Sequence, residues 1–201
     1  MDEMKSSFGI LSNLLMKFKQ ELESKRVAFF SKEERISINF KGILNDIYYP
    51  SDLDEVYEAL RYDIEIILSL GRVFQMLNFK NMGDRDTRIV TNLLNGLMYI
   101  AHSIQIFFED VLNKAKLEML KFRDEDDLEK ITKYLVQFID AVKDLMSKFR
   151  DVIVVVASKT NEDDILNELQ KVVASSDSNF NKEMRNIHYI LFDIVELVDL
   201  L

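Results

Sequence analysis

The sequence lacks cysteine and tryptophan, and its 201 residues include one proline, five glycines and two histidines. Without cysteine the chain can form no disulfide, thiolate metal site or thiol nucleophile. β-Sandwiches and barrels need many turns, and turns use proline and glycine. The scarcity of both residues therefore favours long helices with short connections.

Long hydrophobic runs are also missing, since none approaches the ~20 residues that cross a bilayer. Residues 1–5 lack the basic start and small-residue cleavage site of a signal peptide. The formal net charge of −9 disfavours broad electrostatic capture of nucleic acid or anionic membrane. The apolar fraction of 48% is normal for a protein with a hydrophobic core. We therefore expect a cytoplasmic protein without a nucleic-acid partner or membrane insertion.

Apolar residues recur at helical spacing along nearly the whole chain, which predicts an all-α fold of six to seven helices. The expected helices cover about residues 8–25, 31–46, 52–78, 86–122, 124–156, 161–173 and 180–201. The β-branched run 152–156 is also compatible with a buried strand, but no other strand is available to pair with it. We interpret it as the buried end of a helix. The prediction is a single helical domain with an N-terminal half, 1–82, and a C-terminal half, 83–201.

The only proline marks a hinge between two expected helices. Pro50 cannot donate a backbone hydrogen bond, and it forces the helix that reaches Tyr49 to stop. Asp52 and Glu55 have the spacing of a capping box, which predicts that a new helix begins there. Tyr48 and Tyr49 either wedge the two helices apart or contact a partner.

Residues 44–57, which span this hinge, resemble the PhoU-like family, in the branch of phosphate-transport regulators known as DUF47. The matching positions are Pro50, Asp52, Asp54, Glu55, Val56 and Tyr57. The last helix, with acids at 193, 196 and 199, is similar to the last helix of that family. The resemblance implies two packed three-helix bundles. It also implies a regulator of inorganic phosphate uptake that contacts a transporter.

Members of this family carry Glu-x-x-x-Asp motifs whose carboxylates hold clustered metal ions. The corresponding positions here are Phe30 and Glu34, Arg61 to Glu65, and Thr160 and Asp164. About half of the ligands are missing, so we expect the metal clusters to be reduced or absent. The remaining weak candidates for a degenerate divalent or iron site are Glu34, Glu65, Asp164, His188, Asp193 and Glu196.

The two histidines and the acidic runs also have simpler interpretations. Arg185 occupies the position three before His188, so the Glu-x-x-His spacing of di-iron bundles is missing. His102 and His188 are then ordinary helix residues. The acidic runs 124–127 and 162–164 lie where helix N-termini favour negative charge, so capping is the favoured interpretation.

The sequence thus predicts a non-enzymatic accessory protein of inorganic phosphate transport, without a cofactor, that acts through protein–protein contact. The contact residues suggested by the hinge are Tyr48, Tyr49, Pro50 and Asp52. The alternative is a helical scaffold or oligomerisation module unrelated to phosphate, and a homo-oligomer is compatible with either hypothesis. A metal-dependent enzyme ranks last.

Overall fold

The computed structural model describes residues 6–31, 42, 53–173 and 179–199. These residues form eight α-helices, one short 3₁₀ helix and one π-helical segment, with no strand among them, so the predicted all-α class is confirmed. The helices are α1 (Ser7–Phe30), α3 (Leu53–Ala59), α4 (Ile64–Met76), η3 (Phe79–Asn81), α5 (Asp84–Ile106), η4 (Phe107–Val111, the π segment), α6 (Lys114–Leu120), α7 (Glu125–Ala157), α8 (Glu162–Val173) and α9 (Asn179–Asp199).

Several predictions lie outside the described residues. They are the helix at 31–46, apart from residue 42, the hinge residues Tyr48, Tyr49, Pro50, Ser51 and Asp52, the metal candidate Glu34, and most of the polar linker at 174–179.

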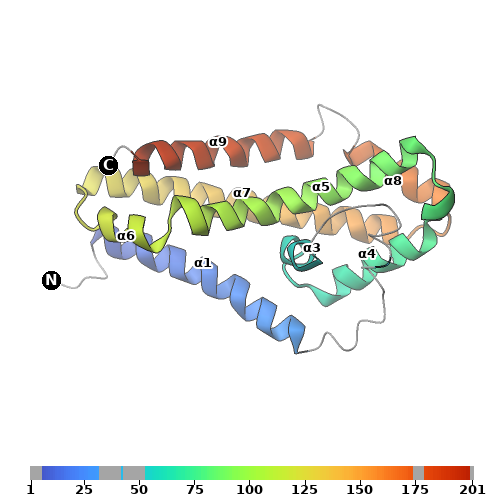
Figure 1. Cartoon of the computed structure of the whole chain (residues 1–201), viewed down its shortest axis with the longest axis horizontal. Coiled ribbons are helices and arrows are strands. Elements are labelled where there is room, and N and C mark those ends of the chain that lie inside the picture. Colours follow the sequence, from blue (N-terminus) through green and yellow to red (C-terminus); the bar gives the residue numbers. More distant parts are fainter. Residues whose placement is uncertain (1–5, 32–41, 43–52, 174–178, 200–201) are drawn as a thin grey trace.

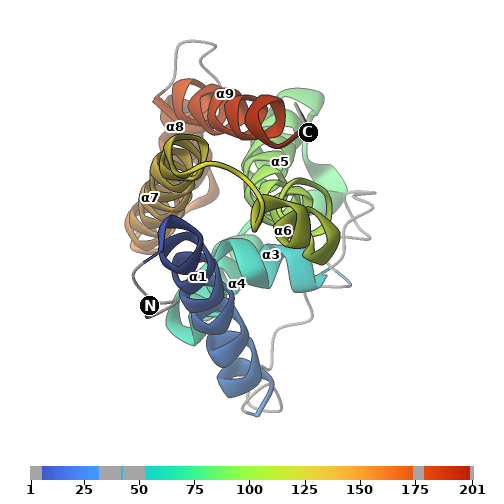
Figure 2. The same cartoon turned by 90° about the vertical axis from the view of Figure 1, so that its left-hand side faces the viewer.

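The described helices form an elongated bundle around α7 (Figure 1). Helix α7 packs against α9 along one side, against α1 and α4 along another, and against α8 near its C-terminal end. Helices α5 and α9 run in the opposite direction to α7, and α3 packs on α5. Viewed along the bundle, α9 lies on the side opposite α1 and α4 (Figure 2).

One connected apolar core runs along this bundle. Two aromatic contacts tie its helices together: Phe107 stacks on Phe138 with ring centroids 4.4 Å apart, and Phe149 meets Phe180 edge-on at 4.5 Å. Gly96 lets α5 approach α7, because a Cβ atom there would lie 2.4 Å from the Phe149 ring. Helices from both predicted halves, 1–82 and 83–201, contribute to this core. The division into two three-helix bundles stays a prediction.

The predicted continuous helix over 52–78 is wrong, because α3 ends at Ala59 and α4 begins at Ile64. Arg61 and Tyr62 between them have positive φ angles of 55° and 54°. This left-handed conformation costs roughly 1–2 kcal/mol per residue. The corner buries Tyr62, which is 7% exposed. It also places Asp63 as the N-cap of α4, where its Oδ1 accepts from Glu65 N at 3.1 Å.

The predicted helix over 86–122 is also interrupted. Helix α5 begins two residues earlier than expected, at Asp84, and gives way to the π segment at Phe107. The wider turn buries Phe107 and Val111 in the core. Asn113 then starts α6, because its side chain accepts from Lys116 N at 3.0 Å.

The predictions for the C-terminal half are largely confirmed. Asp124 caps α7 by accepting from Asp127 N at 2.9 Å, and Asn161 accepts from Asp164 N at 2.8 Å at the start of α8. Run 152–156 is helical, as predicted. Its burial is only partial, however, because Val154 and Val155 are half-exposed at the surface of α7. No helix in the described part of the chain is long and apolar enough to span a membrane.

Candidate functional site

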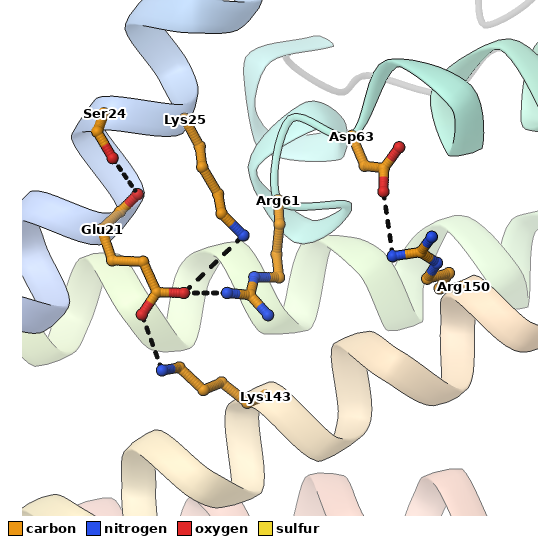
Figure 3. Close-up of polar contacts among 7 residues, drawn as sticks. All are labelled: Glu21, Ser24, Lys25, Arg61, Asp63, Lys143 and Arg150. Atoms are coloured by element: carbon orange, nitrogen blue, oxygen red, sulfur yellow. Dashed lines mark hydrogen bonds and ion pairs between the residues drawn. The ribbon is translucent and has the colours of Figure 1, made fainter.

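The corner between α3 and α4 brings basic side chains from three parts of the chain to one carboxylate (Figure 3). The guanidinium of Arg61 donates to Glu21 Oε1 on α1. Lys143 on α7 donates to Glu21 Oε2 at 2.8 Å. Lys25, one turn after Glu21, has its Nζ 3.9 Å from Oε1. A single carboxylate on α1 therefore interacts with three cations.

A second ion pair lies beside the first. Arg150, two turns after Lys143 on α7, has its Nη1 3.2 Å from Asp63 Oδ2 (Figure 3). We call the set Glu21, Lys25, Arg61, Asp63, Lys143 and Arg150 the basic corner. It holds four cations against two carboxylates. The basic corner is thus locally positive in a chain whose formal net charge is −9.

A hollow of about 260 Å³ opens at the basic corner. Its lining residues come from α1 and from the α3–α4 corner, and they are Lys25, Ala28, Phe29, Arg61, Tyr62, Asp63 and Ile64. The rings of Phe29 and Tyr62, with centroids 5.6 Å apart, give the hollow an apolar side. Lys25 and Arg61 also line the hollow, together with the carboxylate of Asp63. This volume is below that of drug-sized ligand pockets and suits a small anion.

The pKa values at the basic corner show which charge lacks compensation. The hydrogen bond from Lys143 lowers the pKa of Glu21, and Arg61 adds to this effect, while burial opposes it. Burial lowers the pKa of Lys25, and the like charges of Arg61 and Lys143 lower it further, against the attraction of Glu21. Lys25 is therefore a cation whose charged form is penalised by its surroundings. The attraction of a bound anion would offset part of that penalty.

A second group of polar side chains, centred on Asp54 of α3, adjoins the α3–α4 corner. Tyr62 donates from its hydroxyl to Asp54 Oδ1 at 3.1 Å, and Arg26 donates to Asp54 Oδ2 at 2.7 Å. Burial, followed by the charge of Asp54, raises the pKa of Glu58 to about 7. The same two effects raise the pKa of Tyr62. Tyr62 therefore ties the corner to Asp54 on α3 and also lines the hollow.

The metal candidates do not meet at one place in the described structure. Glu65 is exposed on α4, and Asp164 accepts a hydrogen bond from the Asn161 side chain at 2.7 Å. Asp193 and Glu196 line one hollow together, but with Lys130, Lys133, Tyr134 and Leu197. His188 lines a different hollow, and His102 lies 3.2 Å from Glu55. Across residues 6–31, 42, 53–173 and 179–199, no group of three or more His, Asp or Glu side chains could hold a metal ion.

Sequence reasoning missed the basic corner. Glu21, Arg61 and Lys143 are separated by 40 and 82 positions, so no local motif connects them. The predicted continuous helix over 52–78 gave no reason to expect Arg61 at a corner. One local signal was present, because Asp63 with Glu65 and Ile66 after it is a normal start for a helix.

Comparison with protein-family models, with curated proteins and with solved structures finds no match to this chain. The family resemblance of residues 44–57 therefore stays a prediction. Most of that segment, residues 44–52, lies outside the described residues. The function has to be argued from the geometry of the described helices.

Proposed function

We propose that the protein is a non-enzymatic accessory protein of inorganic phosphate transport that acts through protein–protein contact and takes up an inorganic oxyanion at its basic corner. The observation that carries this proposal is the excess of cations over carboxylates around a small hollow. The resemblance of residues 44–57 to phosphate-transport regulators supports the same ligand chemistry. The transporter contact rests on that resemblance alone.

The chemistry of the two lining cations suits a tetrahedral oxyanion. One nitrogen of the Arg61 guanidinium donates to Glu21. A guanidinium has five N–H donors in total, so this bond does not use all of them. Its planar arrangement of donors matches the oxygens of phosphate in pairs. Lys25 supplies a further charge from α1, and the anion would lie between α1 and the α3–α4 corner.

Binding at this place would change how the helices are held together. Without an anion, Glu21 is the group that joins Arg61 and Lys143, and so connects α1, the corner and α7. An anion bound by Lys25 and Arg61 competes for part of these interactions. Anion occupancy would then favour one arrangement of α1 relative to the corner, and a partner that senses α1 could respond to it.

The first test is isothermal titration calorimetry of the full chain with inorganic phosphate, with sulfate and chloride as competing anions. We expect binding in the micromolar to millimolar range, and a loss of about tenfold in Lys25→Gln. Arg72→Gln, which removes an exposed cation from α4, is the matched control and should bind like the parent protein. Absence of heat with phosphate, or equal affinity in Lys25→Gln, would overturn the anion site.

The transport half of the proposal needs a separate measurement. Deleting the gene in the source organism should change the uptake of radiolabelled phosphate, and the Lys25→Gln allele should not restore it fully. Unchanged uptake after deletion would refute the transport role. The second candidate function, a helical oligomerisation module unrelated to phosphate, is favoured by the aromatic outer face of α9.

A further inference from the structure

Helix α9 lies along the edge of the bundle with one face in the core and the other facing outward (Figures 1 and 2). The inner face buries Ile187, Ile190, Leu191, Ile194 and Val198. The outward face carries Arg185, Tyr189, Phe192 and Glu196, which are all exposed. Their spacings of four, three and four residues place them in one line along the helix. We call these four residues the outer stripe.

Two features of the outer stripe are unusual for a free surface. Tyr189 is 63% exposed and Phe192 is 53% exposed, and they are neighbours on the same face. Adjacent exposed aromatic side chains indicate a surface that another protein covers. Arg185 and Glu196, at the two ends of the stripe, take part in no ion pair within the described part of the chain.

The order of residues in the outer stripe is self-complementary. Arg185 and Glu196 are equally far from the midpoint between residues 190 and 191, and so are Tyr189 and Phe192. With a rise of 1.5 Å per residue, these distances are about 8 Å for the charged pair and about 2 Å for the aromatic pair. A second α9 packed antiparallel about that midpoint would place each Arg185 opposite a Glu196. The four aromatic rings would meet in the centre.

We propose that the outer stripe is the interface of a two-fold symmetric homodimer in which the α9 helices of two copies pack antiparallel. Such an interface is isologous, so each charge pair occurs twice. A parallel arrangement would place Arg185 against Arg185, which charge repulsion disfavours. Glu196 of the second copy would face a hollow of about 430 Å³ whose lining includes Arg185, His188 and Tyr189.

The geometry of the bundle keeps this interface apart from the basic corner. Helix α9 packs on one side of α7, while α1 and α4 lie on the other (Figure 2). A dimer through α9 therefore leaves the basic corner of each copy open. Self-association and anion binding can be measured independently, and the failure of one proposal would leave the other standing.

The test is sedimentation equilibrium of the full chain between about 1 and 200 µM, because a single-helix interface is small and of moderate affinity. We expect a monomer–dimer equilibrium. Arg185→Glu alone, or Glu196→Arg alone, should raise the dissociation constant about tenfold or more, since each creates two like-charge contacts. The double variant R185E/E196R should restore association, because it exchanges the charges without changing their complementarity.

The control is Asn186→Glu, which adds a negative charge to the same helix outside the outer stripe and should leave association unchanged. Circular dichroism checks that every variant keeps its helix content. A wild-type monomer over the whole concentration range would overturn the proposal. A dissociation constant that is unchanged in both single variants would also overturn the proposal. So would a double variant that associates as weakly as the single variants.

Discussion

Glu21 on α1 accepts a hydrogen bond from Lys143 on α7 at 2.8 Å, across 122 positions of the chain. The same carboxylate accepts from Arg61, so it joins two helices and the corner between α3 and α4. We expect Glu21→Gln to leave Lys25, Arg61 and Lys143 close together without a balancing charge. The loss in stability should be about 1 kcal/mol, because the carboxylate is partly exposed and screened.

Urea unfolding followed by circular dichroism measures this loss. Glu23→Gln, an exposed carboxylate on the same helix, is the control and should be close to neutral. Millimolar phosphate should restore more stability to Glu21→Gln than to the parent protein, because the anion replaces the missing charge. Equal stabilisation of both proteins would contradict an anion site at the basic corner.

Glu58 makes the stability of the protein depend on pH. Burial raises the pKa of Glu58 from 4.5 to about 7 in the folded chain, so the folded state holds its proton more tightly than the unfolded state. The associated stability is fully present below pH 4.5 and is lost as pH rises through about 7. Glu58→Gln stays neutral and keeps that stability at high pH.

We therefore expect Glu58→Gln to match the parent protein near pH 4 and to exceed it near pH 8, by roughly 2 kcal/mol or less. Urea unfolding at the two pH values provides the measurement. Glu65→Gln, which changes an exposed carboxylate on α4, is the control. A parent protein that is at least as stable as Glu58→Gln at pH 8 would contradict the raised pKa of Glu58 in the folded state.

Alanine should destabilise the protein at Gly96 but not at Gly83. A Cβ atom at position 96 would lie 2.4 Å from the Phe149 ring. That ring is buried and held edge-on by Phe180, so it cannot move aside freely. Gly96→Ala should cost about 1–3 kcal/mol through overpacking. Gly83 has no heavy atom within 4 Å of the same position, and Gly83→Ala should stay within about 0.5 kcal/mol.

The test compares the melting temperatures of the two alanine variants, measured by calorimetry. Gly96 lies within α5 and Gly83 is its N-cap, so helix propensity alone favours alanine at position 96. A loss of stability there despite this preference reports the close contact of α5 with α7. Equal melting temperatures would mean that these helices separate easily at Gly96, contrary to the close packing described above.

Asp63 both caps α4 and forms an ion pair with Arg150 at the corner. Two substitutions can separate these contributions. Asp63 Oδ1 caps α4, and its Oδ2 faces Arg150 at 3.2 Å. Asp63→Asn retains a capping oxygen but loses the charge, whereas Asp63→Ala loses both. We expect Asp63→Ala to be less stable than Asp63→Asn by about 1 kcal/mol in chemical unfolding. If the two variants are equally stable, the cap contributes nothing measurable.

The sequence predicts those parts of the fold that local signals determine. Helix α7 was found over nearly its full length, because Asp124 provides a capping oxygen and the apolar spacing continues to Val156. The predicted start of a helix at residue 161 is likewise local, because Asn161 accepts from Asp164 N at the start of α8. Such signals involve residues three or four positions apart, which a single sequence reveals.

Features that depend on distant contacts could not be predicted in this way. The apolar spacing of Leu60, Ile64 and Ile67 continues across the α3–α4 corner, so periodicity alone does not show the break. The left-handed residues Arg61 and Tyr62 carry no glycine signal. The basic corner exists only because α1 and α7 meet at that break. The metal candidates were taken from local motifs, and the fold disperses those that the structure describes.

Helix α7 also determines how close the two proposed functional surfaces are. Lys143 and Arg150 extend from it toward the basic corner, and Lys148 in between forms an ion pair with Glu183 near the start of α9. Helix α7 thus lies between the basic corner and α9. Both surfaces contact the same helix, so a movement of α7 is the route by which anion binding and dimerisation could affect each other. Any influence of the anion on dimerisation must be matched by an equal influence of dimerisation on anion affinity.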